Sequence, residues 1–189
     1  PGTLLVHAVW VDEEDRKRIA DRGASVVHNP ESNMKLASGV APIPELIEQG
    51  VPVGLGTDGS ASNNNLDLFE EMDFAAKLHK VNRLDPTMMD AETVLNMATT
   101  DGADAIGLGK VVGSLEEGKM ADVIVLDMQK PHLVPMYHPV SHIVYAAKGS
   151  DVRDVIVNGK VLVKDGRLLT IDLEKLFERV TEVGRLIKK

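Results

Sequence analysis

The chain has 189 residues, no cysteine and a formal net charge of −8, from 29 acidic and 21 basic residues. The lack of cysteine excludes disulfide bridges and thiolate metal sites, so His, Asp or Glu would have to hold any metal. The acidic balance argues against a nucleic-acid-binding surface, and no apolar run reaches the roughly 18 to 20 residues of a membrane span. We therefore expect a folded cytoplasmic protein without nucleic-acid or membrane partners.

In the first part of the chain, short apolar runs alternate with helix-length segments, a pattern typical of βα units on a parallel sheet. We expect strands at 4–9, 24–27 and 51–55. We expect helices at 12–22, around Pro44, at about 66–80 and at 94–106, with a loop over 31–42. The apolar run Leu4-Leu5-Val6 stands at the very start, so we also expect the chain to begin in mid-fold, as a truncated sequence or a separately encoded half.

The pattern changes to short strands in the last part of the chain, expected at 123–126, 155–157 and 161–163. Asn158-Gly159 is a tight hairpin signal, and 173–189 is expected to form a closing amphipathic helix. These patterns divide the chain into a barrel portion over 1–109 and a small β subdomain over 110–189.

Three successive predicted strands end close to His7, His28 and Asp58. In a parallel βα barrel these ends share one face, where imidazole and carboxylate groups can bind a divalent cation or transfer protons. A plain structural role is equally open for His7 and is favoured for His28, since His-Asn-Pro can stop a strand. Asp58 is harder to explain structurally, because a carboxylate after an apolar strand is costly to desolvate without a cation or donors.

Several longer strings resemble the amidohydrolase superfamily and, within it, the 5'-methylthioadenosine/S-adenosylhomocysteine deaminase group. The strings are His-Asn-Pro-Glu-Ser-Asn-Met-Lys-Leu-Ala-Ser-Gly at 28–39, Gly-Thr-Asp-Gly-Ser-Ala-Ser-Asn-Asn at 56–64, Gly-Ser-Leu-Glu-Glu-Gly-Lys-Met-Ala-Asp at 113–122, Val-Asn-Gly-Lys at 157–160 and Asp-Gly-Arg at 165–167. They cover essentially the whole chain in the family's order. The resemblance implies an α/β fold: the C-terminal part of a metal-dependent (β/α)8 TIM-barrel hydrolase, strands six to eight, followed by a β-sandwich subdomain.

The resemblance also implies roles for individual residues. Asp58 would bind a divalent metal, zinc by family habit, and take a proton from the attacking water. His7 would contact the substrate ring and polarise the reacting centre, while Ser62 and Asn63 would bind the ribose or thioether tail. His28 would be structural or would support a residue that touches the metal or the substrate. The implied reaction of the complete enzyme is hydrolytic removal of the adenine 6-amino group from a small nucleoside.

The departures from the family pattern are equally informative. No His-x-His pair occurs, and the metal-binding histidine of strand five and its neighbouring glutamate have no counterparts. The remaining histidines lie in a predicted helix or in the β subdomain; they are His79, His132, His138 and His142. Pro139 makes a regular helix through His138 and His142 doubtful. Since catalytic zinc usually has three protein ligands, we expect the isolated chain to be inactive.

Three alternatives stay open. The chain could belong to a guanine, cytosine or triazine aminohydrolase of the same superfamily, although the 60–64 loop favours the adenosine-thioether group. It could be a non-catalytic barrel half that acts as an assembly partner, or a binding module, which would leave Asp58 unexplained. An open sheet edge beside Leu4-Leu5-Val6 predicts a homo-oligomer or pairing with a missing N-terminal portion.

Overall fold

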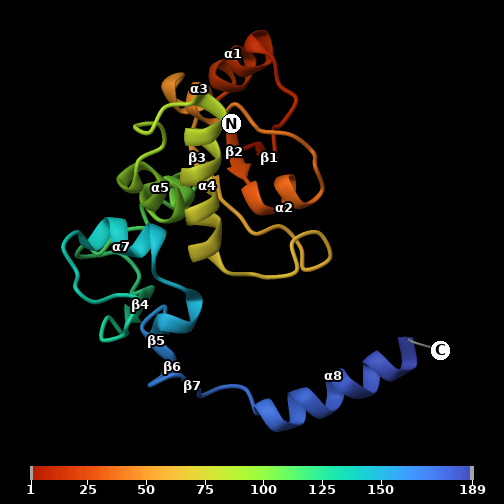
Figure 1. Ribbon diagram of the computed structural model, residues 1–189, viewed down its shortest axis with the longest axis vertical. Helices are drawn as coiled ribbons and strands as arrows, with labels where there is room; N and C mark the ends of the chain where they lie inside the picture. Colours follow the sequence, from red (N-terminus) through yellow and green to blue (C-terminus); the bar gives the residue numbers. More distant parts are fainter. Residues whose placement is uncertain (1, 188–189) are drawn as a thin grey trace. The chain divides into compact units, whose positions relative to one another are not determined.

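The computed structural model describes residues 2–187 and contains two compact units (Figure 1). The first unit comprises the chain up to Lys119 together with Met128–Gly149, and the second comprises Met120–Asp127 and the chain from Ser150 onward. None of the helices within residues 2–187 combines the length and the apolar character needed to cross a bilayer.

The first unit is built on a three-stranded parallel sheet of order β1-β2-β3, with β1 at Leu4–Val6, β2 at Ser25–His28 and β3 at Val53–Leu55. Val27 pairs with Val6 on one side and with Gly54 on the other. Because all three strands run the same way, their carboxyl ends meet at one edge of the sheet. The expected parallel α/β arrangement is confirmed, although β1 and β3 are shorter than predicted.

Seven helices of the described chain belong to this unit. They are α1 (Glu13–Asp21), α2 (Pro30–Lys35), α3 (Ile43–Glu48), α4 (Leu68–Arg83), α5 (Ala91–Ala98), α6 (Thr100–Ala105) and α7 (Pro139–Tyr145). Aspartates cap several of them: Asp12 forms a capping box on α1, and Asp67 and Asp90 accept backbone amides at the starts of α4 and α5.

Two expectations about prolines were wrong. The 31–42 segment is not a continuous loop, because Pro30 opens α2 in the first-turn position, where the missing amide costs nothing. Pro139 likewise opens α7, and the His138 side chain caps that helix by accepting the Ser141 amide. At both places the proline starts a helix instead of preventing one.

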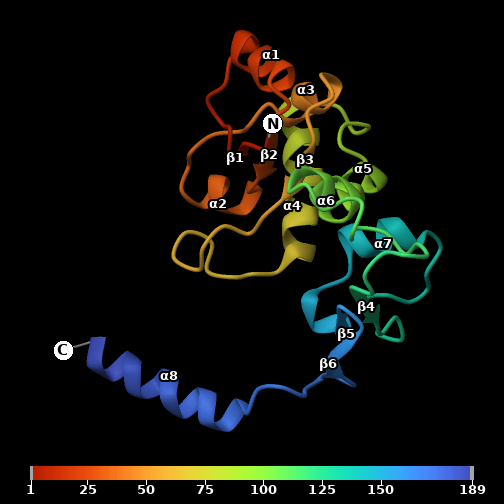
Figure 2. The same ribbon diagram turned by 180° about the vertical axis from the view of Figure 1, so that it is seen from behind.

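The core of the first unit lies where the helices cover the sheet. Val26 of the central strand is fully buried, as are Leu46 of α3 and Met97 of α5. Helix α6 packs closely on β3, as Figure 2 shows from behind. A Cβ added to Gly54 would lie 3.0 Å from the Gly102 Cα, so glycine at both positions allows this approach.

The second unit contains one antiparallel sheet of order β4-β5-β6-β7 among the described residues, with strands at Val123–Leu126, Val152–Val157, Lys160–Lys164 and Arg167–Leu168. Asn158 and Gly159, with φ of 49° and 74°, form the predicted hairpin turn between β5 and β6. Helix α8 (Leu173–Ile187) forms as predicted, but its apolar side, including Phe177 and Val180, is exposed; Lys188 and Lys189 lie outside the described residues.

Candidate active site

His7 and Asp58 lie at the carboxyl edge of the parallel sheet. His7 directly follows β1 and donates its backbone amide to the Val27 carbonyl at 2.9 Å, while Asp58 follows shortly after β3. Both residues have a left-handed backbone, with φ of 70° and 59°. A non-glycine residue in this region is strained by on the order of 1–2 kcal/mol, so the surrounding contacts must hold both residues there.

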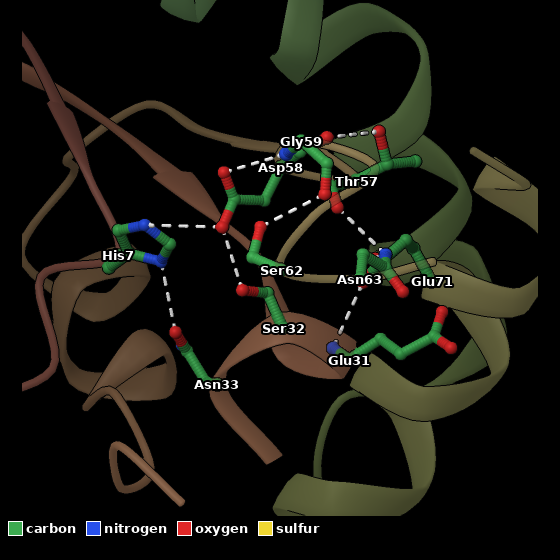
Figure 3. Close-up of polar contacts among 10 residues, drawn as sticks. All are labelled: His7, Glu31, Ser32, Asn33, Thr57, Asp58, Gly59, Ser62, Asn63 and Glu71. Carbon is green, nitrogen blue, oxygen red and sulfur yellow. Dashed lines mark hydrogen bonds and ion pairs between the residues drawn. The ribbon is translucent and has the colours of Figure 1, made fainter. Parts of the chain in front are cut away.

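The two side chains face each other across the strand ends (Figure 3). The His7 Nε2 lies 3.8 Å from the Asp58 Oδ2, and the His7 Nδ1 lies 2.9 Å from the Asn33 Oδ1. Because the Asn33 oxygen can only accept, Nδ1 carries a proton, and a neutral His7 then points its Nε2 lone pair at Asp58. Two electron-pair donors at this separation favour a proton or a cation between them.

Three groups surround the Asp58 carboxylate. The Ser32 hydroxyl donates to Oδ2 at 2.7 Å and the Gly59 amide donates to Oδ1 at 2.7 Å. The Ser62 hydroxyl donates to the Gly59 carbonyl at 2.9 Å and can rotate to donate to Asp58 instead. Ser62, Ser32 and Gly59, in that order, lower the pKa of Asp58 to about 2, so the carboxylate is ionised at neutral pH.

A buried polar group stands behind the carboxylate. The Asn63 amide nitrogen donates to the Thr57 carbonyl and to the Glu71 Oε1, each at 2.7 Å, and the Glu71 Oε2 accepts the Glu31 amide at 3.2 Å. Glu71 is fully buried, and burial raises its pKa to about 7. Asn63, predicted to touch substrate, is 3% exposed and faces Thr57 and Glu71.

His28 is fully buried at the end of β2 and faces His79 of α4, with the two Nε2 atoms 3.1 Å apart. Burial is the largest cause that lowers the pKa of both histidines. It lowers the pKa of His28 well below its usual value and that of His79 to about 4. A neutral pair can share one proton between the two nitrogens. This packing agrees with the structural role expected for His28.

Two of the four predicted site residues border an open pocket of about 350 Å³, whereas Ser62 and Asn63 are not part of its lining. Its lining includes both His7 and Asp58, together with Ser32 and Asn33, and the apolar side chains Trp10 and Leu36 form part of its wall. The pocket therefore combines an anion and an imidazole with a surface on which a flat ring could pack.

The metal donors of this site are incomplete. Within residues 2–187 no group of three or more His, Asp or Glu side chains is close enough to hold a metal ion. Asp58 and His7 supply two donors, whereas catalytic zinc usually has three protein ligands. The described residues alone therefore do not fit a catalytic zinc centre.

Sequence reasoning missed Ser32, Asn33, Glu71 and His79 as parts of this arrangement. The sequence predicts a loop over 31–42 and so gives no role to Ser32 and Asn33, whereas α2 carries both toward the strand ends. For Glu71 a signal existed: it is a carboxylate one residue before Met72, within the buried part of an amphipathic helix.

Comparison with known proteins identifies the family. Residues 2–162 match the profile of the amidohydrolase family. The chain belongs to this family. Among solved structures, this amidohydrolase resembles a zinc-bound adenosine deaminase from Xanthomonas campestris, with a TM-score of 0.95, 40% identity and coverage of 98% of this chain and 42% of the other.

Its sequence relatives include a 5-methylthioadenosine/S-adenosylhomocysteine deaminase from Syntrophobacter fumaroxidans, 57% identical over 100% of this chain and 43% of the relative. A 5'-deoxyadenosine deaminase from Methanosarcina barkeri is 54% identical over 94% of this chain and 41% of the relative. The atrazine chlorohydrolase TrzN from Arthrobacter aurescens, complexed with zinc, is similar at a TM-score of 0.87 and 31% identity, over 95% of this chain and 40% of the other. The chain thus spans about 43% or less of the length of these relatives.

Proposed function

We propose that this amidohydrolase chain forms part of an enzyme that hydrolyses the adenine 6-amino group of 5'-methylthioadenosine and S-adenosylhomocysteine. The observation that carries the proposal is the convergence of His7 and Asp58 on one pocket. The chain is also 57% identical to a relative named 5-methylthioadenosine/S-adenosylhomocysteine deaminase. Deamination at this carbon requires a water to be oriented and deprotonated and an amine to be protonated as it leaves.

In this proposal the ionised Asp58 orients the attacking water and receives its proton. His7, held by Asn33, stabilises the charge that develops at the ring. Ser62 lies on the exposed loop beside Asp58 and contacts the ribose or the thioether tail. We assign Asn63 a supporting role behind Asp58, because a substrate contact would require its amide to leave Thr57 and Glu71.

We also propose zinc as the cofactor of the complete enzyme, supported by the bound zinc of the Xanthomonas campestris neighbour. When bound, such a cation lowers the pKa of a water molecule so that hydrolysis can proceed near neutral pH. Asp58 would be one ligand, and the others would come from outside the donor set described above.

The rest of the barrel is also a proposal. β1 and β3 each pair with only one strand among the described residues, and Leu4 and Val6 of β1 are 40% and 52% exposed. An open parallel edge of this kind is a template for another strand. We propose that further strands complete a (β/α)8 barrel, from an N-terminal portion or a separate chain, and that the antiparallel sheet belongs to the predicted β-sandwich subdomain.

A hybrid enzyme tests this proposal. The matching 188 residues of the Syntrophobacter fumaroxidans relative are replaced by this chain. Ammonia release is then measured with 5'-methylthioadenosine, S-adenosylhomocysteine, 5'-deoxyadenosine and a triazine, and bound metal is quantified. Deamination of the two thioethers supports the proposal. Preference for 5'-deoxyadenosine would support the activity named for the Methanosarcina barkeri relative, and a folded, metal-loaded hybrid that ignores every nucleoside would contradict the proposal.

A further inference from the structure

The buried carboxylate of Glu71 connects two segments that are separate in sequence. Through its Oε2 it accepts the Glu31 amide in the first turn of α2, at 3.2 Å. Through its Oε1 it accepts the Asn63 amide at 2.7 Å, and the same nitrogen donates to the Thr57 carbonyl at 2.7 Å. One side chain of α4 thus holds both the start of α2 and the loop that follows β3 (Figure 3).

These two segments carry the groups that set the geometry of the site. Helix α2 carries Ser32, whose hydroxyl donates to Asp58 at 2.7 Å, and Asn33, which lies 2.9 Å from the His7 Nδ1. The loop after β3 carries Asp58 itself, one residue beyond Thr57, whose carbonyl accepts the Asn63 amide. Asp58 has a left-handed backbone conformation with φ of 59°. A strained residue keeps its conformation only where the neighbouring contacts hold it.

We infer that Glu71 is a positioning residue whose buried carboxylate, through Asn63 and the start of α2, fixes the placement of Asp58 relative to His7. Its effect on catalysis rests on the proposed function, whereas its effect on the geometry of Asp58 does not.

We call the hydrogen bonds that join Glu71 to Asn63 and to the Glu31 amide the brace. Their chemistry requires a carboxylate at position 71. Both Glu71 oxygens receive N–H donors, and an Asn63 amide has two hydrogens, which Thr57 and Glu71 use. A flipped Asn63 would place its oxygen against two acceptors. Glutamine at position 71 offers one acceptor oxygen and a donor nitrogen, so it can keep only one of the two connections. The substitution preserves size while breaking half of the brace.

Burial makes the Glu71 carboxylate costly to ionise. Glu71 is fully buried, and burial is the main reason that its pKa is raised to about 7, with Glu31 and Asp58 adding repulsion. A buried charge that is costly to ionise is expected to be retained for what it holds in place. A neutral glutamine removes that cost but leaves one buried N–H donor without an acceptor, so Glu71→Gln should lower the thermal midpoint by a few degrees.

Hydrogen exchange on the 189-residue chain tests the inference directly. The Gly59 amide, which donates to the Asp58 Oδ1 at 2.7 Å, does not touch Glu71, whereas the Glu31 amide does. In Glu71→Gln we expect the Gly59 amide to exchange at least about tenfold faster, the size expected for loss of one hydrogen bond to a charged group. Glu70→Gln, a substitution at the neighbouring position of α4, should leave it unchanged. Faster exchange at Glu31 alone would overturn the inference, since it would show a purely local role.

A second variant covers the case in which Glu71→Gln does not fold. Asn63→Ala removes the other half of the brace and should speed exchange at Gly59 by a similar factor, and normal protection at Gly59 in this variant would overturn the inference. Where both single variants fold, the Gly59 amide of the double variant should exchange little faster than in the more affected single variant. The reason is that both substitutions break the same connection between Glu71 and Asn63.

In the hybrid enzyme, Glu71→Gln should lower kcat at least about tenfold while KM stays within about threefold, as expected for a misplaced catalytic group. An unchanged kcat would overturn the inference. If the unmutated hybrid shows no deamination, the proposed function fails, and the exchange of Gly59 still decides the role of Glu71.

Discussion

The Nε2 of His7 and the Oδ2 of Asp58 lie 3.8 Å apart, although they follow different strands and each has a left-handed backbone. The parallel pairing of β1, β2 and β3 brings them to the same edge of the sheet, and Ser32 and Asn33 of α2 each hold one of them. This arrangement leads to specific expectations about His7, the two serines, the sheet edge and the buried histidines.

His7 is expected to act directly on the substrate. Asparagine tolerates its left-handed backbone but lacks an imidazole, so His7→Asn should lower kcat of the hybrid enzyme by about 100-fold or more while the thermal midpoint stays within a few degrees. Steady-state ammonia release and thermal unfolding measure the two effects. His142→Asn is the matched control, and a His7→Asn enzyme as fast as this control would exclude a direct role.

The pKa of Asp58 should respond to its serine neighbours. Ser62 and Ser32 are the two largest causes of its fall from 3.8 to about 2, so Ser62→Ala and Ser32→Ala should each raise it toward 3.8. A carboxylate with a lowered pKa adds stability that is present above pH 3.8 and lost as the pH falls through about 2. In both variants the stability contributed by the Asp58 carboxylate should therefore be smaller, and it should be lost at a higher pH than in the wild type. Carboxyl NMR titration measures the pKa, with Ser38→Ala as the control, and an unchanged Asp58 titration in both serine variants would be inconsistent with this geometry.

The exposed edge of β1 should make the isolated chain self-associate. Val6 is 52% exposed on an unpaired strand edge, and a lysine on such an edge opposes pairing with another strand. We expect Val6→Lys to shift the chain toward the monomer in sedimentation-velocity experiments. Val81→Lys, at a 66% exposed position on helix α4, should have no such effect. A wild-type chain that is monomeric at high concentration would argue against an association-prone edge.

The His28–His79 pair should make the fold sensitive to mild acid. The pKa of His79 falls from 6.5 to about 4, so the unfolded chain binds a proton that the folded chain excludes. This stability is complete above pH 6.5 and declines as the pH falls toward about 4, by about 3 kcal/mol for His79 at 1.36 kcal/mol per pKa unit. Urea unfolding at several pH values should show a shallower decline for His79→Gln than for the wild type.

His142→Gln, the control substitution, should keep the full decline with pH. Lys80, whose positive charge also lowers the pKa of His79, remains in every variant and does not change the comparison. Equal slopes for His79→Gln and the wild type would show that the pair does not exclude protons from the fold.

The sequence predicted the parallel sheet and the meeting of His7 and Asp58 at its carboxyl edge. The apolar runs that became β1 and β3 end beside His7 and Asp58, and parallel strands must place those ends together, so the convergence followed from topology. The sequence also predicted the turn at Asn158 and Gly159 and the helix beginning at Leu173, because turn chemistry and helical periodicity are local signals.

What the sequence did not reveal depends on contacts between distant residues. Pro30 is compatible with a strand stop and with a helix start, and only packing selects the helix that carries Ser32 and Asn33. Glu71 and His79 lie on α4 among apolar neighbours, where helical periodicity marks a buried face but not its partners. Their contacts with Asn63 and His28 arise only once the helix lies against the strand ends.

The most direct measurement is ammonia release from S-adenosylhomocysteine and 5'-methylthioadenosine by the hybrid enzyme, compared with its Asp58→Asn and Asp21→Asn variants. We predict that the hybrid and Asp21→Asn deaminate both compounds, that Asp58→Asn is slower by at least about 100-fold, and that the 189-residue chain alone is inactive. Deamination by Asp58→Asn at the rate of the Asp21→Asn control would contradict the assignment of the active site to the meeting point of Asp58 and His7.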